Sequence, residues 1–311
     1  PFFISPTAST RLFHPAKGEL AMAGAAHEKK VIYACSTLAS QTLEDIAEAN
    51  PGSKWVQLYV WNDKEIVKTF LKRARAAGFT GCILTVDMPV AGNRERDPRN
   101  HFAVPPTPNL KIARQVLARP GWLWDLVRSP KITPANFTHL RGGNAGETGG
   151  VIGFVNEQFS RSVTWDDVRW MRDAWEGGFA IKGISRAEDA KNAIEIGADA
   201  VWVSNHGGRQ LDSSVPVIDL LPEIADAVRG RADIIADGGV RRGSHVAKLL
   251  MRGATGVALG RASLFGLGAG GQPGVERALS IIEDELRRTM ALLGATSIGE
   301  LEPELMRVPK F

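Results

Sequence analysis

Eight short apolar runs, each followed by a segment with helical periodicity, recur along almost the whole chain. The apolar residues are near-continuous within each run, which is typical of parallel strands covered on both faces. Eight such units over about 265 residues predict one α/β domain, residues 1–311, built as a (β/α)₈ TIM barrel. A doubly wound open sheet is the alternative. The expected strands are residues 2–8, 31–37, 55–60, 81–87, 179–184, 200–205, 233–239 and 256–262.

Residues 88–163 interrupt this alternation of strands and helices between the fourth strand and its helix. Insertions of this length in a compact domain are usually functional. Residues 99–132 hold Trp122 and Trp124 and are strongly basic, whereas residues 138–153 are rich in glycine and expected to be flexible. We therefore expect either a lid or a segment that touches a membrane surface. The cationic residues are Arg99, Lys111, Arg114, Arg119, Arg128 and Lys131, against the single acid Asp125.

The C-terminal tail, residues 273–295, has the pattern of an amphipathic helix. Such a helix can close the bottom of the barrel or pack on a partner.

Composition bounds the ligand class and the compartment. The net charge of +4 is mildly basic, which suits an anionic small molecule, and we expect no nucleic-acid partner. Cys35 and Cys82 both lie in apolar runs, as expected in a reducing compartment. The sequence shows neither a signal peptide nor a long apolar span, so we expect a cytoplasmic protein, with peripheral contact at the inner face of the membrane left open.

Polar residues gather where the expected strands end. Gln57 and Tyr59 lie two residues apart on one strand and share a face, as do Thr85 and Asp87 on the next. The carboxyl ends of barrel strands carry the chemistry of this fold, and burying charge is costly unless it is paired or used. A functional site is therefore expected at one mouth of the barrel. The other strand ends hold Pro6, Thr7, Ala8, Ser36, Arg94, Lys182, Ser204 and Asp237.

The last two strands end in glycine and arginine. The runs ADGGVRRG and ALGRAS place Gly238, Gly239 and Arg241 after one strand and Gly260 and Arg261 after the other. Backbone N–H groups and a guanidinium bind phosphate well, and these two loops form the usual phosphate site of the fold. Two glycine turns with surface arginines are the alternative.

The run VSNHGGRQLD, residues 203–212, ends the sixth strand in an imidazole, two glycines and a guanidinium. His206 can act here as a general base, while Arg209 holds the carboxylate of an anionic substrate. Asp87 could orient the imidazole and stabilise its protonated form. Lys182, in the apolar run FAIKGI, is either a Schiff-base lysine or a positive charge beside an electron-accepting ring. The other histidines lack ligand spacing, so no metal site is expected.

These stretches resemble the FMN-dependent 2-hydroxy acid dehydrogenases and oxidases. SNHGGRQLD is the most specific, and PTA, QLY, TVD, NRERD, IKG, ADGGVRRGSHV and LGRA occur in the family's order over nearly the whole chain. The resemblance implies a barrel that binds FMN and oxidises a small (S)-2-hydroxy acid to the 2-oxo acid. It implies oxygen, a quinone or another acceptor for the electrons, and a homo-oligomer, often a tetramer.

The resemblance also implies roles for the residues of the mouth. His206 would accept the substrate proton with Asp87 behind it, Arg209 and Arg94 would clamp the carboxylate, and Tyr59 would bond the substrate oxygens. Lys182 would stabilise the reduced flavin. The remaining flavin contacts would come from Pro6, Thr7, Ala8, Ser36, Gln57, Thr85, Ser204, Asp237, Gly238, Gly239, Arg241, Gly260 and Arg261.

The sequence also departs from the family pattern. The family carries an N-terminal segment with another carboxylate-binding tyrosine, whereas this chain opens inside its first strand, so we expect that segment to be absent. Leu38 stands where glycolate oxidase has a large aromatic residue, which leaves room for lactate or mandelate. Ala8, where some membrane dehydrogenases have glycine, favours reaction with oxygen. Residues 99–132 resemble the segment that attaches bacterial mandelate and lactate dehydrogenases to membranes.

Two other functions compete with this hypothesis. The first is an FMN-binding barrel with impaired turnover, because the N-terminal segment is missing. The second is a different barrel for phosphate ligands, such as a nucleotide dehydrogenase or an isomerase. That reading needs a catalytic cysteine or a metal constellation, and neither is evident in the sequence.

Overall fold

Eight parallel strands close into a barrel, which confirms the predicted (β/α)₈ fold and excludes the open sheet. The computed structural model describes residues 1–101, 109–140, 153–155 and 157–306. Neighbouring strands in the chain pair with one another, and β1 closes the barrel on β8. The strands are β1 Phe2–Ile4, β2 Tyr33–Cys35, β3 Lys54–Tyr59, β4 Gly81–Thr85, β5 Gly178–Ile184, β6 Ala200–Val203, β7 Asp233–Ala236 and β8 Gly256–Leu259.

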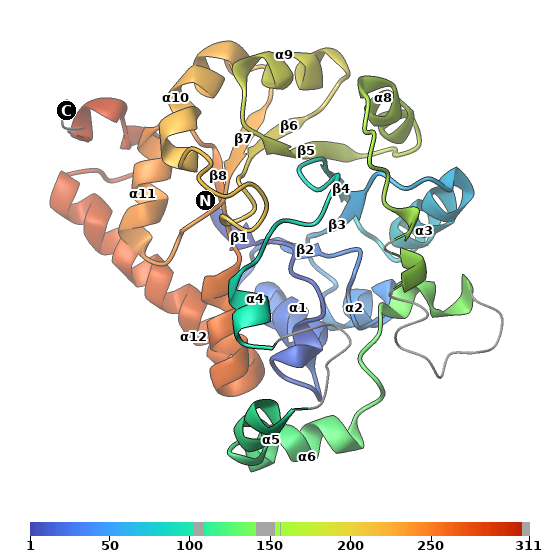
Figure 1. Cartoon of the computed structure of the whole chain (residues 1–311). Helices are drawn as coiled ribbons and strands as arrows, with labels where there is room; N and C mark the ends of the chain where they lie inside the picture. The colour runs from blue at the N-terminus through green and yellow to red at the C-terminus, as the bar shows by residue number, and fades with distance from the viewer. Residues whose placement is uncertain (102–108, 141–152, 156, 307–311) are drawn as a thin grey trace.

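A ring of helices covers the outside of the barrel (Figure 1). The predicted apolar faces of these helices pack on the strands, and α8, for example, begins at a capping box formed by Thr164 and Asp167. Inside the barrel, Phe3 meets Trp202 edge to face with ring centroids 5.4 Å apart, so the barrel is filled rather than hollow. The helices are α1 Gly18–Glu28, α2 Leu43–Ala49, α3 Lys64–Ala76, α8 Trp165–Asp173, α9 Ala187–Glu195, α10 Val217–Val228, α11 Gly243–Met251 and α12 Arg261–Leu293.

Most strands are shorter than the apolar runs suggest. Residues 5–8, 237–239 and 260–262 were expected in strands but follow them. Gly238 and Gly239 have φ of 100° and 73°, outside the range of a strand, and Arg261 already starts α12. The polar residues of these segments therefore sit just beyond the ladder, where backbone N–H groups face the mouth.

The tail helix expected over residues 273–295 is the second part of α12, which kinks at Gly270 and Gly271. It packs against α1 and α11 and so completes the outer ring. The Glu285 carboxylate accepts hydrogen bonds from Gly243 N at 2.9 Å and Arg242 Nη1 at 2.8 Å, which fixes α12 to the start of α11.

The insertion of residues 88–163 carries the short helix α4 Arg96–Arg99 and a helical hairpin of α5 Leu110–Leu117 and α6 Pro120–Arg128. This hairpin lies at the periphery, away from the strands (Figure 1). It is followed by the 3₁₀ helix η2, Ala135–Leu140. Most of the glycine-rich stretch predicted to be flexible, residues 141–152, lies outside the described residues.

Candidate active site

The predicted site residues all lie at the carboxyl ends of the strands. Gln57 and Tyr59 belong to β3, Thr85 to β4 and Lys182 to β5. Because parallel strands end on the same face of a barrel, these side chains share one mouth. The rest follow the strands: Pro6, Thr7 and Ala8 after β1, Ser36 and Leu38 after β2, Asp87 and Arg94 after β4, Ser204, His206 and Arg209 after β6, Asp237, Gly238, Gly239 and Arg241 after β7, Gly260 and Arg261 after β8.

His206 and Asp87 form a hydrogen-bonded pair between two neighbouring loops. The Nδ1 atom of His206 lies 3.0 Å and 3.2 Å from the two carboxylate oxygens of Asp87. An ionised carboxylate only accepts hydrogen bonds, so Nδ1 donates and Nε2 is the acceptor of the ring. An imidazole held in this way is suited to take a proton at Nε2.

The backbone around His206 is unusual. His206 has φ of 56°, and Gly207 and Gly208 follow at 69° and 71°. The N–H of His206 donates to Ser204 Oγ at 3.0 Å, which helps to hold the turn. A left-handed conformation is uncommon for a residue with a side chain, and such strain gathers at functional sites.

The charge of Asp87 is preserved despite its surroundings. Burial by itself raises the pKa of the Asp87 carboxyl, but the hydrogen bond from His206 and the positive charge of Lys182 outweigh it, so its pKa falls below the ordinary value. Asp87 is therefore a carboxylate at neutral pH, and it orients the imidazole through Nδ1.

Two guanidinium groups lie beside this pair. Arg94 Nε donates to the carbonyl oxygen of Arg209 at 3.5 Å. Desolvation and then the like charge of Arg94 lower the pKa of Arg209. An anion placed between two such cations is stabilised by both, and a carboxylate fits their planar donors.

Tyr59 completes this side of the mouth. Its ring packs against Phe159, with centroids 4.8 Å apart. Burial and then the Asp87 carboxylate raise the pKa of the Tyr59 hydroxyl. Tyr59 therefore remains protonated and can donate a hydrogen bond.

Lys182 belongs to a buried polar network that joins β5 to the ends of β6 and β7. Its Nζ donates to Ser204 Oγ at 2.9 Å and lies 3.5 Å from Asp237 Oδ2. Ser204 Oγ in turn donates to Asp237 Oδ1 at 2.6 Å, and the indole N–H of Trp202 donates to Asp237 Oδ2 at 3.2 Å. The lysine is thus paired with a carboxylate, which is how a buried ammonium keeps its charge.

A second network links β2, β3 and β4. Gln57 Nε2 donates to Thr85 Oγ1 at 3.0 Å, and Ser36 Oγ donates to Gln57 Oε1 at 3.4 Å. The N–H of Thr37 also donates to Gln57 Oε1, at 3.2 Å. Three residues predicted from separate strands therefore form one continuous hydrogen-bonded wall.

These residues fit the FMN that the resemblance implies. The hydroxyl of Thr7 is buried and has no hydrogen-bond partner among the described residues, so it is available to a ligand. The hydrogen-bonded networks of Gln57 and Lys182, at the same mouth, offer donors and acceptors to a heterocyclic ring. The positive charge of Lys182 suits a ring that gains electrons.

The opposite end of the mouth fits a phosphate. A Cβ at Gly239 or Gly260 would meet only open space, and α12 begins directly after Gly260, so the N–H groups of its first turn face this region. Arg261 is held across it by a 2.9 Å hydrogen bond from Nη2 to the carbonyl of Gly207. Arg241 is exposed, and its backbone N–H donates to His245 Nδ1 at 3.3 Å.

Three residues that contribute to the site were not predicted. Gln210, in the loop after β6, bonds to the loop after β4 that carries Asp87, Trp202 holds Asp237, and Phe159 packs on Tyr59. Gln210 lies within the run SNHGGRQLD, so its place in that motif was the signal available. Trp202 and Phe159 read as ordinary apolar residues.

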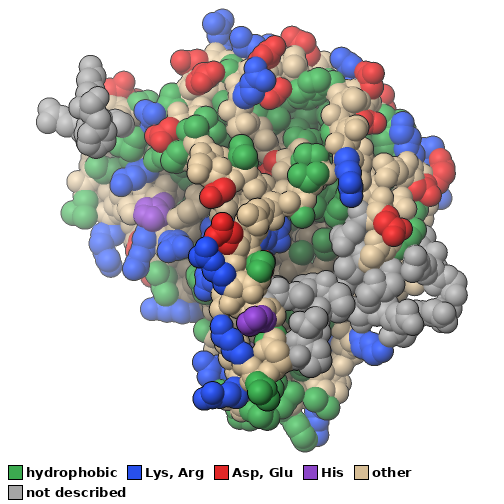
Figure 2. All heavy atoms as spheres, viewed as in Figure 1, with side chains coloured by type: hydrophobic (Ala, Val, Ile, Leu, Met, Phe, Trp, Pro, Cys, Tyr) green, Lys and Arg blue, Asp and Glu red, His purple; other side chains and the backbone are tan. Residues whose placement is uncertain are grey.

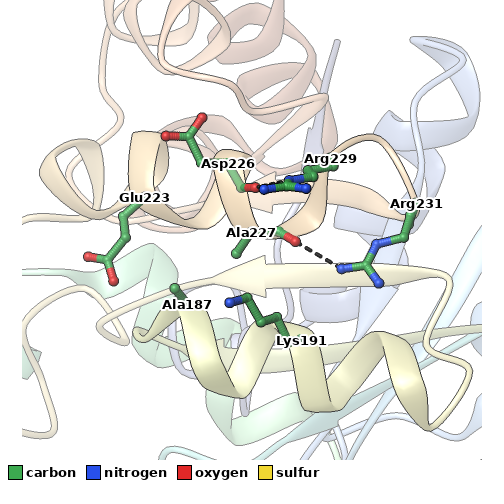
Figure 3. A pocket seen from close by; sticks show the side chains of 7 residues that line it. All are labelled: Ala187, Lys191, Glu223, Asp226, Ala227, Arg229 and Arg231. Carbon is green, nitrogen blue, oxygen red and sulfur yellow. Dashed lines mark hydrogen bonds between the residues drawn. The ribbon is translucent and has the colours of Figure 1, made fainter.

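A groove on the outside of the barrel, between α9 and α10, holds none of these residues (Figure 3). Its lining mixes Lys191, Arg229 and Arg231 with Glu223 and Asp226. Arg229 and Arg231 donate to carbonyls near the end of α10, so they are engaged in ending that helix. The groove therefore offers no comparable chemistry.

Comparison with known proteins gives a consistent result. The family described as FMN-dependent dehydrogenase matches residues 1–308. An L-lactate dehydrogenase of Ectopseudomonas mendocina is 40% identical, over 98% of this chain and 80% of its own length. An L-lactate oxidase of Nostoc sp. is 38% identical, over 99% of this chain and 80% of its own length.

Among solved structures, a monotopic membrane protein, (S)-mandelate dehydrogenase, superposes with a TM-score of 0.93 at 35% identity. The match covers 99% of this chain and 80% of that one. In the part of the chain that the structure describes, no helix combines the length and apolarity needed to cross a bilayer.

Proposed function

The chain belongs to the FMN-dependent dehydrogenase family, and we propose that it oxidises a small (S)-2-hydroxy acid, such as lactate or mandelate, to the 2-oxo acid. The observation that carries the proposal is the His206–Asp87 pair beside the two guanidinium groups of Arg94 and Arg209. The lactate and mandelate enzymes named among the relatives support this class of substrate.

The residues of the mouth have separate roles in binding the substrate and in moving its proton. Arg94 and Arg209 bind the substrate carboxylate, and Tyr59 donates a hydrogen bond to a substrate oxygen. This orientation brings the hydroxyl and the α-carbon to Nε2 of His206, which takes a proton. Asp87 stabilises the imidazolium that results, because its carboxylate stays ionised beside it.

FMN, when bound, accepts the two electrons that leave the substrate. Pro6, Thr7, Ala8, the Gln57 wall and the Lys182 network would hold its ring, and the loops after β7 and β8 would hold its phosphate. Lys182 favours a ring that gains negative charge. Oxygen, a quinone or another acceptor would take up the electrons from the reduced group, and Ala8 in the loop after β1 favours oxygen.

The half-buried Leu38 supports a substrate larger than glycolate. Its carbonyl accepts hydrogen bonds from Ser9 N at 3.0 Å and Ser9 Oγ at 3.3 Å, so the loops after β1 and β2 are joined at this residue. Lactate and mandelate differ mainly in the bulk of the side chain that such a position would face.

The α5–α6 hairpin is proposed as a membrane contact at the inner face. Leu110, Leu117, Trp124 and Val127 are 58–85% exposed, and the Arg128 guanidinium lies 3.9 Å from the ring centroid of Trp124. Figure 2 shows cationic and apolar side chains gathered at the foot of the view, over α5 and α6. Apolar residues with arginine and tryptophan suit the interface of an anionic bilayer.

Anaerobic reduction of the bound flavin tests the proposed reaction. Purified holoprotein is mixed with lactate, mandelate or glycolate without oxygen, and the visible absorbance is followed. Bleaching by lactate or mandelate supports the proposal, and the relative rates rank the substrates. A flavin that stays oxidised with every 2-hydroxy acid contradicts it. Re-oxidation by air or by a soluble quinone then identifies the acceptor.

A further inference from the structure

We propose that Gln210 is the positioning residue that sets the spacing of Arg94 and Arg209 for the substrate carboxylate. This inference rests on the proposed function and concerns the site that would bind the substrate carboxylate. Gln210 follows Arg209 in the loop after β6, whereas Arg94 belongs to the loop after β4, so a contact between them joins the two halves of the site.

The amide of Gln210 is engaged at both ends. Its Nε2 donates to the carbonyl oxygens of Asp87 at 3.2 Å and Val90 at 3.0 Å. Its Oε1 accepts from Arg94 Nη2 at 3.3 Å and from the N–H of Gly92 at 3.4 Å. One neutral side chain therefore spans the loop from the residue that pairs with His206 to the arginine that would bind substrate.

The two loops also approach each other closely at Gly92. A Cβ at Gly92 would collide with the carbonyl oxygen of Arg209 and lie 2.7 Å from Gln210 Cα. Arg94 Nε donates to that same carbonyl at 3.5 Å. Arg94 is thus held by the two consecutive residues Arg209 and Gln210.

The hydrogen bonds that join Gln210 to Arg94 and its loop are needed because the two arginines repel each other. The like charge of Arg94 contributes to the lowered pKa of Arg209. Before an anion arrives, the Gln210 amide opposes this repulsion with hydrogen bonds that carry no net charge. Asp87 has other supports: its side chain bonds His206, and the N–H of the preceding Val86 donates to Lys182 O at 2.9 Å. Loss of Gln210 should therefore disturb Arg94 more than the histidine pair.

The test compares three variants of the FMN-loaded protein. Gln210→Met keeps the length of the side chain but makes none of the four hydrogen bonds. Gln210→Glu keeps an acceptor for Arg94 and loses both donors. Gln272→Met is the matched control, because its amide bonds Glu276 on α12 at 3.0 Å. For each we would measure KM and kcat, the dissociation constant of oxalate by calorimetry, and the melting temperature.

Gln210→Met should raise KM and the oxalate dissociation constant about tenfold, as expected for loss of one charge-assisted hydrogen bond, and change kcat less than threefold. Gln210→Glu should also weaken oxalate binding, because its carboxylate would pair with Arg94 in place of the ligand, and Gln272→Met should match wild type. Oxalate affinity within twofold of wild type in folded Gln210→Met overturns the inference, as does a fall in kcat at unchanged KM. If wild type reduces no flavin, the proposed function fails, while the oxalate titration still decides the role of Gln210.

Discussion

Gly183 faces Asp87 so closely that a Cβ at position 183 would lie 2.6 Å from the Cβ of Asp87 and 2.9 Å from its Cγ. Gly183 also has φ of 105°, in β5 where its register with β6 shifts. The glycine therefore provides both the space and the backbone conformation that seat the carboxylate under His206.

Gly183→Ala should therefore reduce kcat/KM at least tenfold and lower stability by about 1–3 kcal/mol, because Asp87 must move and the backbone is strained. Flavin reduction rates and urea unfolding would measure both effects. Gly230→Ala is a useful control, because it also has positive φ but open space around its Cβ position. Equal losses of activity in the two variants would point to strain alone.

His206→Ala should abolish flavin reduction by substrate and leave FMN bound. The imidazole is the only base we assign to the substrate proton, and a missing general base costs about 10²–10⁴-fold in rate. Stopped-flow reduction and the flavin content of the purified variant are the measurements. Reduction at the wild-type rate would remove His206 from the mechanism.

Asp87 should contribute stability that depends on pH in the acidic range. The hydrogen bond from His206 and the charge of Lys182 hold the folded pKa of Asp87 below the ordinary value for aspartate, so the contribution is complete above that ordinary value and is lost as pH falls through the folded pKa. The difference in melting temperature between wild type and Asp87→Asn should therefore be constant near neutrality and shrink below about pH 4. Asp284→Asn, at an exposed position on α12, is the control. If the difference in melting temperature between wild type and Asp87→Asn grows on acidification, Asp87 does not stabilise the fold in the way expected from its lowered pKa.

Glu19 should matter for both stability and FMN binding. This fully buried carboxylate accepts hydrogen bonds from Thr10 N at 2.9 Å, Ser40 N at 2.9 Å and Ser40 Oγ at 2.7 Å, so it ties the loop after β1 to the loop after β2. Glu19→Ala leaves these donors without their partner and should cost about 2–4 kcal/mol. Urea unfolding would measure the cost, and titration of the apoprotein with FMN should show weaker binding. Unchanged affinity would limit Glu19 to a structural role.

The α5–α6 hairpin should bind anionic vesicles. Replacing Trp124 and Val127 by serine should reduce co-sedimentation with phosphatidylglycerol vesicles severalfold, because both side chains are exposed and apolar. Binding should also weaken with salt. Replacement of the exposed Leu292 on α12 by serine serves as control. Equal binding to anionic and uncharged vesicles would argue against the role of the basic residues.

The order of strands and helices could be predicted because parallel strands buried on both faces leave continuous apolar runs. The ends of the strands were predicted less accurately. Asp237 and Arg261 directly follow apolar runs in the sequence, but they lie beyond the last paired residues of β7 and β8. The pairing of His206 with Asp87 followed from the convergence of strand ends and is confirmed as a contact. The roles of Gln210 and Phe159 could not be predicted, because both depend on how long loops fold back across the mouth.

Two parts of the long insertion that follow the hairpin are bonded to the barrel side of the molecule. Phe159 forms a bridge with Trp61, Asn62 N donates to Gln158 O at 2.8 Å, and Ala135 N donates to Ala39 O at 3.0 Å. The α5–α6 hairpin, residues 110–128, lies before all of these contacts in the chain, so changes to the hairpin leave the packing of Phe159 on Tyr59 in place. The surface that the hairpin presents can therefore change in sequence while the mouth of the barrel keeps its geometry.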